Sequence, residues 1–556
     1  MTDPNRRTLL LAGVGASTAL IGGAVWWRSR NAGSGPSVGS ASAERSLADT
    51  EKSSAEAEPT EAEPTVANLR IPGREGLLAE FKLGAEPLLL RANEAAFALF
   101  SGAATPLWHY AADVAGVAMA NPLLSIMRGQ TLHVRLHNAL GEDTTIHWHG
   151  MHIDEANDGS GLHPVAPGDE RVYQFEVRNR AGLYLYHAHP HGRTGMQFQR
   201  GLASALLVLD DEEIALRQRL DLPWGERDIP LLIADKQIGA DNAIQYEIGA
   251  DDWIGNRVLI NWTPEPVLDV VPGLYRFRLA NVANARMFRP AFLHRGEPLP
   301  MTLIGSDGGL LAKPWPVDDL FLAPAQRLDV LVDFSELEPG DEVMLHSLDY
   351  VAMENEDEAT FQPNLMRHHP GAAPMGSAID LMQIRVVATG DGARVHSPPL
   401  PPTLSSLPPL PDTGAWPLRP FVLRLDDAGR WLINDWNMHL NGHAPMFEVK
   451  RGAREVWEIR NSMASMPHPI HVHGIQFRVV RRTLSPPDIR GRAVAGDGLG
   501  PTDLGLLDTV VIWPGETVAI ALDFAQPYRG PQRYMLHCHN LEHEDMGMMV
   551  TFAVVD

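Results

Sequence analysis

The chain has 556 residues, of which 44% are hydrophobic, and its 69 Asp and Glu outnumber its 46 Lys and Arg, giving a formal net charge of −23. This charge argues against nucleic acid and anionic membrane surfaces as partners, because both would repel the protein. Once residues 1–70 are set aside, roughly 485 residues remain, a length that exceeds most single domains and suits three.

Residues 1–43 have the features of an export signal. The run Asn5–Leu10 contains a twin-arginine pattern, and an apolar stretch follows from Leu9 to Trp27. This pattern predicts export by the twin-arginine machinery to the periplasm or to the outside of the cell. Ala41–Ala43 offers a small-residue cleavage motif, but it lies further from the apolar stretch than usual. Cleavage therefore stays open, and an uncleaved segment would tether the protein to the membrane.

The remaining chain divides by composition. Residues 44–70 are mostly Glu, Ala, Ser, Thr and Pro and predict a disordered linker, because they cannot bury enough apolar surface to fold. Beyond them, short alternating apolar runs separated by Gly and Pro predict antiparallel strands and an all-β architecture of packed sandwiches. The predicted domains are 71–210, 211–395 and 416–556, with a Pro-rich linker at 396–415.

Histidines recur in pairs of the form His-x-His. With 23 His in 556 residues, random placement would give roughly one such pair, whereas the sequence contains five. In a strand the two imidazoles of a pair point to the same face, and neutral imidazole is the commonest metal ligand in proteins. The pairs are His147 and His149, His187 and His189, His189 and His191, His471 and His473, and His537 and His539. Chance accounts for roughly one of these pairs, and we expect the others to bind metal.

The region around Cys538 adds a softer ligand. Cys538 is the only cysteine, so it has no partner for an internal disulfide. A Cys thiolate, two His and a weak axial Met form the trigonal site of a blue copper, and Cys538, His543 and Met548 lie within eleven residues. His468 can supply the second imidazole. The two histidines that flank Cys538 would point to the opposite face of the same strand, so one strand would connect two metal sites.

These motifs resemble those of three-domain bacterial multicopper oxidases, a family that includes laccases and cuprous oxidases. The resemblance covers residues 75–556, and in the middle domain it rests on Tyr275–Asn281, Ser306–Gly309 and Arg327–Asp333. It implies three cupredoxin-like Greek-key β-sandwich domains, of which the middle one has no copper motif. It also implies four copper ions: one of type 1, one of type 2 and a type 3 pair.

The resemblance also assigns the ligands by their place in the motifs. Type 1 copper is expected at His468, Cys538, His543 and Met548. Type 2 copper is expected at His147 and His471. The type 3 coppers are expected at His149, His187 and His539, and at His189, His473 and His537. Asp158 and Glu544 match acidic residues that relay protons in the family, although an ordinary Asp-Gly turn also explains Asp158.

The implied activity is an oxidase that takes single electrons from a reducing substrate and passes four of them to dioxygen, which becomes two waters. The substrate stays open between a phenol or aromatic amine, as for laccases, and a metal ion such as Cu(I), Mn(II) or Fe(II). The alternative is a non-catalytic exported scaffold of the same fold, but no ligand is substituted. The chain is expected to act as a monomer and not to bind nucleic acid.

Other polar features are weaker signals. The loop Arg481–Leu507 follows the type 1 motif, and its acidic residues would suit either kind of substrate. The stretch Met353–Met382 contains thioethers, which select Cu(I), but Met382 lies in an apolar run typical of a core. Two interpretations of this stretch therefore stay open: a labile metal site and a structural loop. Structural or surface positions are expected for His191, His439 and His443.

Overall fold

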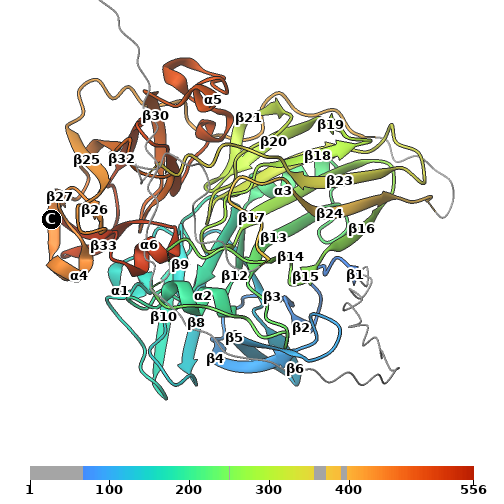
Figure 1. Ribbon diagram of the computed structural model, residues 1–556, viewed down its shortest axis with the longest axis horizontal. Helices are drawn as coiled ribbons and strands as arrows, with labels where there is room; N and C mark the ends of the chain where they lie inside the picture. The colour runs from blue at the N-terminus through green and yellow to red at the C-terminus, as the bar shows by residue number, and fades with distance from the viewer. Residues whose placement is uncertain (1–66, 250, 356–370, 390–396) are drawn as a thin grey trace, which may run out of the picture. The chain divides into compact units, whose positions relative to one another are not determined.

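The computed structural model describes residues 67–249, 251–355, 371–389 and 397–556. The predicted twin-arginine signal and most of the predicted linker 44–70 lie outside these residues. The described residues form six β-sheets, which group into three pairs along the chain, and six short α-helices (Figure 1). No helix within the described ranges is long and apolar enough to cross a lipid bilayer.

The first pair of sheets is built from residues 76–209. One sheet has the strand order β10 (Glu170–Glu176), β8 (Thr131–Asn138), β4 (Leu88–Phe97), β5 (Thr105–Val114), β6 (Val117–Ala120) and β2 (Gly76–Leu77). The other has the order β3 (Glu80–Lys82), β7 (Leu123–Met127), β12 (Ala203–Leu209), β11 (Gly182–His187) and β9 (His147–His149). Burial alternates along β8, as expected for a strand with one face in a core. That core includes Leu136, Trp148 and Tyr186.

The middle pair is built mainly from residues 228–386. One sheet has the order β1 (Ala67–Asn68), β16 (Pro266–Val270), β24 (Ile379–Val386), β23 (Glu342–Ser347), β18 (Pro290–His294) and β19 (Glu297–Leu299). The other has the order β15 (Thr263–Pro264), β14 (Arg257–Ile260), β13 (Asp228–Lys236), β17 (Leu274–Asn281), β22 (Arg327–Asp333), β20 (Met301–Ser306) and β21 (Gly309–Val317). In β17, Phe277 and Leu279 join the apolar core.

The third pair is built from residues 418–555. One sheet has the order β26 (Trp431–Ile433), β25 (Leu418–Leu425), β28 (Arg454–Asn461), β32 (Thr517–Asp523) and β30 (Phe477–Thr483). The other has the order β27 (Pro445–Lys450), β34 (Met549–Val555), β33 (Gln532–Cys538), β29 (His468–Val472) and β31 (Thr509–Ile512). Its core includes Trp457, Ile470, Cys538 and Met548. The predicted all-β fold is thus confirmed.

The helices are short and lie in the connections between strands. They are α1 (Glu155–Asp158), α2 (Thr194–Arg200), α3 (Asp211–Arg219), α4 (Met438–Asn441), α5 (Pro487–Arg490) and α6 (Leu541–Asp545), with 3-10 turns η1 (Gly496–Gly498) and η2 (Pro501–Leu504). Asp210 caps α3 by accepting a hydrogen bond from the N–H of Glu213. The α1 and α6 helices matter most for function, because each carries one of the predicted acids.

Parts of both predicted linkers pack against the middle pair of sheets. Ala67–Asn68, at the end of the predicted linker 44–70, pair in parallel with β16, and Leu69 is buried in the middle core. In the Pro-rich segment 396–415, Leu404 is buried in the same core, and the Ser405 hydroxyl donates to the carbonyl of Leu311 at 2.9 Å. Average composition hides a single leucine such as Leu69, which is why the end of the linker 44–70 looked unpacked. The domain boundaries themselves stay predictions.

Candidate metal centre

The first candidate site lies at the end of β33. Cys538 is the last residue of this strand and pairs with Ile470 of β29, and its side chain lies in the core of the third pair. The side chain of Asn540 accepts hydrogen bonds from N–H groups at the start of α6, where the chain turns back toward Cys538. As a result, His468 Nδ1 lies 3.5 Å and His543 Nδ1 lies 3.7 Å from Cys538 Sγ. All three side chains are fully buried.

The surroundings prepare these atoms to bind a metal. The Ser465 hydroxyl lies 3.0 Å from Nε2 of His468, which leaves Nδ1 to face the thiol. Met548 is also fully buried, and its carbonyl accepts a hydrogen bond from the N–H of Cys538 at 3.1 Å. Burial lowers the pKa of His468 well below its usual value and raises the pKa of the Cys538 thiol well above it. The imidazole is therefore neutral, and a bound cation would be needed to form the thiolate.

Eight further histidines converge between the first and third pairs of sheets. Strand pairing explains half of the arrangement, because His147 of β9 lies opposite His187 of β11 and His471 of β29 lies opposite His537 of β33. Rings from the two pairs of sheets then stack on each other, as His149 does on His471 with centroids 3.8 Å apart. Burial lowers the pKa of His187 to about 4 and that of His149 well below its usual value. The rings of His149 and His187 are therefore neutral at pH 7.

Most of these rings use one nitrogen to contact the surrounding protein. The Nδ1 contacts are His147 to the Asp158 carbonyl (2.8 Å), His187 to the Ala188 carbonyl (2.9 Å), His471 to the Asp508 carbonyl (2.8 Å), His473 to Asp158 Oδ2 (2.9 Å) and His537 to the Cys538 carbonyl (2.9 Å). Among the described residues, these buried nitrogens have no hydrogen-bond partner: His147 Nε2, His149 Nδ1, His187 Nε2, His189 Nε2, His471 Nε2 and His539 Nε2. Buried polar atoms are rarely left this way, so the cluster suits a cation.

The potential ligand atoms fall into groups in which all atoms lie within 4.8 Å of one another. The groups include His149, His187 and His539; His189, His473 and His537; His468, Cys538 and His543; His147, His149 and His471; and His147, Asp158 and His473. The first three coincide with the type 3 and type 1 sets expected from the sequence, and the fourth contains both residues of the type 2 set. The structure therefore brings together every predicted His and Cys ligand, and their copper roles stay a prediction.

Asp158 lies at the end of α1 and is buried against two of these histidines. Its Oδ2 lies 2.9 Å from Nδ1 of His473, and its carbonyl contacts Nδ1 of His147. Gly159 follows with a φ of 71°, and a Cβ there would clash with the Ile146 carbonyl, so the turn requires glycine. Burial raises the pKa of Asp158 to about 8. The predicted Asp-Gly turn and a buried acid beside the cluster are therefore both present.

Glu544 and its neighbour Glu542 approach the sites from α6. Glu544 is buried, with Oε1 lying 3.3 Å from His189 Nδ1 and Oε2 lying 3.3 Å from His537 Nδ1. The Glu544 carboxylate thus contacts two histidines, His189 and His537, that belong to one group of potential ligands. Glu542 was not anticipated from the sequence; it accepts a hydrogen bond from Asn284 Nδ2 at 2.8 Å, and burial raises its pKa to about 7.

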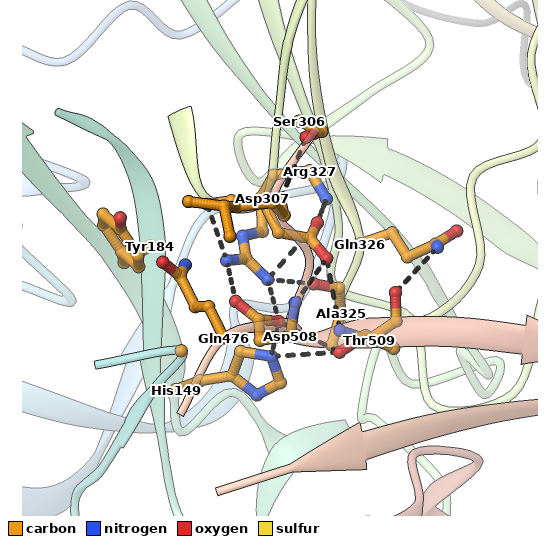
Figure 2. A network of polar contacts seen from close by, with 12 residues as sticks. His149, Tyr184, Ser306, Asp307, Ala325, Gln326, Arg327, Gln476, Asp508 and Thr509 are labelled. Atoms are coloured by element: carbon orange, nitrogen blue, oxygen red, sulfur yellow. Dashed lines mark hydrogen bonds and ion pairs between the residues drawn. The ribbon is translucent and has the colours of Figure 1, made fainter. Parts of the chain in front are cut away.

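A buried ion-pair network connects the histidine cluster to the middle pair of sheets, as Figure 2 shows. Asp508 Oδ1 lies 2.9 Å from Nε2 of His149, and the Asp508 carbonyl contacts Nδ1 of His471. Arg327 of β22 donates to both carboxylate oxygens of Asp508, at 2.8 and 2.6 Å. Asp307 in turn accepts a hydrogen bond from the backbone N–H of Arg327 at 2.8 Å. The bidentate guanidinium therefore fixes a carboxylate that touches two predicted ligands.

The sequence did not point to this network. Arg327 contributed to the resemblance without a role, and Asp508 was not singled out. A weak signal was present, because Asp508 directly precedes the apolar strand Thr509–Ile512, and a carboxylate at the start of a buried strand needs a partner. The partner could not be identified, because 181 positions separate Arg327 from Asp508.

The ring of His543 is approached from the middle pair by two acids. Asp251 Oδ1 lies 3.1 Å and Asp252 Oδ1 lies 3.4 Å from His543 Nε2. The Asp251 side chain is 56% exposed, so it brings negative charge from the surface to this ring. In the loop Arg481–Leu507, by contrast, Asp503 is buried and paired with the Arg482 guanidinium at 2.8 Å. Asp503 is therefore not available to a substrate.

Comparisons with known proteins were made for the whole chain. Three family models, each described as Multicopper oxidase, match residues 103–213, 241–363 and 417–556. The chain is 31% identical over 457 residues to a laccase from Bacillus stratosphericus, covering 76% of this chain and 83% of the laccase. The fold matches the crystal structure of the McoA multicopper oxidase from Aquifex aeolicus, with a TM-score of 0.77, 33% identity, and coverage of 88% and 100%. It also matches a multicopper oxidase from Campylobacter jejuni described as a metallo-oxidase, with a TM-score of 0.68, 25% identity, and coverage of 88% and 98%.

These matches include the segments that carry the histidine and cysteine motifs. They confirm the cupredoxin-like fold, and they fit a catalytic oxidase better than the scaffold alternative. The chain belongs to the multicopper oxidase family and is a copper-dependent oxidoreductase that uses dioxygen as its electron acceptor.

Proposed function

We propose that the chain binds four copper ions with the ligands predicted from the sequence. The proposed ligands are His468, Cys538, His543 and Met548 for type 1, His147 and His471 for type 2, and His149, His187, His539, His189, His473 and His537 for the type 3 pair. The observation that carries the proposal is the set of buried imidazole nitrogens without hydrogen-bond partners in the described residues, because a bound cation would compensate for their burial. Bound copper supplies one-electron redox chemistry and the reduction of dioxygen.

Strand β33 provides the connection between the two sites. Cys538 belongs to one site, and His537 and His539 belong to the other, so one peptide unit separates them on each side. The strand is paired with β29 on one side and β34 on the other, which holds these side chains on rigid backbone. This pairing supports a short and fixed covalent path for electrons.

Asp158 and Glu544 are suited to hold protons for the formation of water. Asp158 Oδ2 lies against His473, and its raised pKa of about 8 lets the carboxyl carry a proton near neutral pH. Glu544 reaches the other side of the same group through His189 and His537. A cavity of about 330 Å³ is lined by His473 and gives small molecules room beside this ring.

The surface beside His543 favours a positively charged electron donor. Asp251 is exposed and lies 3.1 Å from His543 Nε2, and Asp252 adds a second carboxylate at 3.4 Å. Two carboxylates beside this ring, one of them exposed, attract cations. A metal ion therefore suits this edge better than a neutral phenol.

A narrow pocket beside His468 supplies soft donors. Met287, Met375 and Met466 line it, together with the two prolines on either side of His468. Thioethers select Cu(I), so we propose Cu(I) as the preferred substrate. Within the stretch Met353–Met382, residues 356–370 lie outside the described residues, and Met382 is buried in the core as expected.

The test is a comparison of kcat/KM for Cu(I) and for a phenol on the copper-loaded protein. The Asp251→Asn variant should lose about 1 kcal/mol of electrostatic attraction between this carboxylate and Cu(I). Its KM for Cu(I) should therefore rise roughly fivefold. KM for the phenol should stay unchanged. Asp488→Asn removes the same charge from α5 and serves as the control. A preference for the phenol, with no effect of Asp251→Asn on Cu(I), would favour a laccase.

We also propose that the chain is exported by the twin-arginine machinery and acts as a monomer in the periplasm or outside the cell. The support is the pattern around Arg6 and Arg7 and the apolar stretch that follows. Replacing both arginines with lysine should keep the protein in the cytoplasm, as cell fractionation would detect. Release of the wild-type protein by osmotic shock, without detergent, would argue against a membrane tether.

A further inference from the structure

Three histidines outside the proposed copper ligands lie close together near the surface. His191 follows the strand β11, His439 lies in α4, and His443 comes directly after that helix. The ring centroid of His191 is 5.1 Å from that of His439 and 5.2 Å from that of His443. No sequence motif groups these three histidines, because about 250 positions separate His191 from the other two.

This spacing fits imidazoles that share one metal ion. With a metal–nitrogen bond of about 2.0–2.1 Å and tetrahedral angles, two ring centroids are expected roughly 5.2 Å apart. The proposed type 1 ligands His468 and His543 show the same spacing, with centroids 5.1 Å apart. Direct stacking would bring the centroids much closer, as in the 3.8 Å contact between His149 and His471. The ring of His191 is therefore spaced from each of the other two rings as two ligands of one metal ion are.

The local backbone holds these rings in place. His439 Nε2 contacts the carbonyl of Asp545 at 2.7 Å, an orienting contact typical of metal-binding imidazoles, which leaves Nδ1 available. His191 Nδ1 is buried and, within the described residues, has no hydrogen-bond partner. Gly442 ends α4 with a φ of 70°, a conformation that favours glycine, and so directs the chain to His443. The cluster thus contains one buried ring nitrogen without a partner, His191 Nδ1, and one ring oriented by a backbone carbonyl, that of His439.

We propose that His191, His439 and His443 form a binding site for a borderline divalent cation such as Zn²⁺ or Cu²⁺, separate from the four proposed copper ions. Imidazole is the preferred ligand of these ions, and three protein ligands leave a fourth position for water. His439 and His443 are exposed, so the ion exchanges with solvent. Its effect is mechanical: it joins α4 of the third pair to the segment that carries His189. The site does not depend on the proposed function.

Equilibrium dialysis of the copper-loaded protein against Zn²⁺ tests this site. We expect one Zn²⁺ per chain beyond the copper content, and a dissociation constant at least about tenfold higher in His443→Ala and in His191→Gln. His443 is exposed, so its variant should fold normally. His133→Ala removes a half-buried histidine on β8 and should bind Zn²⁺ like the wild type. Zn²⁺ should also raise the melting temperature of the wild type and not that of His443→Ala.

Each outcome decides the proposal. Wild-type protein that takes up no Zn²⁺, or a His443→Ala variant that binds it with wild-type affinity, would overturn it. Copper content and the blue absorbance are measured in the same samples, and neither should change in the variants. A further outcome is that the wild type binds Zn²⁺ but no copper, while His443→Ala binds no Zn²⁺. That result would support the zinc site and contradict the proposed function.

Discussion

Replacing Arg327 with methionine should weaken copper binding at the histidine cluster without removing any proposed ligand. Arg327 belongs to the middle pair of sheets, and its guanidinium donates to both oxygens of Asp508 at 2.8 and 2.6 Å. Asp508 contacts His149 through its carboxylate and His471 through its carbonyl. In the variant this carboxylate would stay buried and lose its bidentate partner, so both histidines would lose part of the support that orients them.

Two effects set the expected size of the change. Removing one partner of a buried ion pair costs about 3–5 kcal/mol of stability. Loss of an outer partner of a metal-binding histidine lowers metal affinity about 10–100-fold, or roughly 1.4–2.8 kcal/mol. Arg286→Met should bear the same stability cost, because the buried Arg286 pairs with Asp235 at 2.7 Å, but Asp235 contacts none of the proposed ligands. Copper affinity therefore separates the two variants.

The assay is dialysis of copper-loaded protein against increasing chelator, with copper per chain and blue absorbance recorded together. Arg327→Met should lose cluster copper at roughly 10–100-fold lower chelator concentration than the wild type, while its blue absorbance persists. Arg286→Met should retain copper like the wild type. If Arg327→Met retained copper as the wild type does, Asp508 would not depend on Arg327 to support the histidines.

Three further predictions test other parts of the structure. Cys538→Ser should lose the blue colour and the oxidase activity together, because the chain has no other thiolate; a variant that kept the blue colour would contradict a bond between Cys538 and copper. Asp158→Asn should keep the colour but slow dioxygen reduction by roughly 10²-fold or more. The anaerobic reduction of the type 1 site should be unchanged. If the variant reduced dioxygen as fast as the wild type, Asp158 would not deliver protons. Lys236 is buried, and burial lowers its pKa to about 7. Above that pH the unfolded chain binds one more proton, so stability should rise with pH up to about 10, by at most about 1.4 kcal/mol per unit. Urea unfolding at pH 7 and 9 should show this slope in the wild type and not in Lys236→Met; parallel slopes would contradict it.

Much of the proposed site could be predicted because its parts are local in sequence. A His-x-His pair on a strand presents two imidazoles to one face regardless of the rest of the fold, so each motif already fixes a pair of side chains. The pairing of His471 with His537 then follows from adjacent strands of one sheet. The blue copper set is similarly compact, since Cys538 and His543 are joined by one turn into α6.

The surroundings of the site were not predictable, because they depend on contacts between distant segments. His149 and Asp508 are 359 positions apart, and a carboxylate has no sequence periodicity that would reveal its partner. Asp251 lies in an irregular segment of the middle pair, and only the packing of that segment brings it to His543. The packing of the Pro-rich segment was not predictable for a related reason, since the burial of Leu404 depends on the core it joins.

The middle pair has no copper motif, yet its side chains reach both proposed sites. Arg327 holds Asp508 beside the histidine cluster, Asp251 lies 3.1 Å from His543, and Asn284 donates to Glu542 beside that same histidine. A part that served only as a spacer would need none of these contacts, because each buried polar group loses its hydration and must be paired. The geometry of both sites therefore depends on the middle pair. Substitutions there should change copper retention and substrate oxidation, although every proposed ligand comes from elsewhere in the chain.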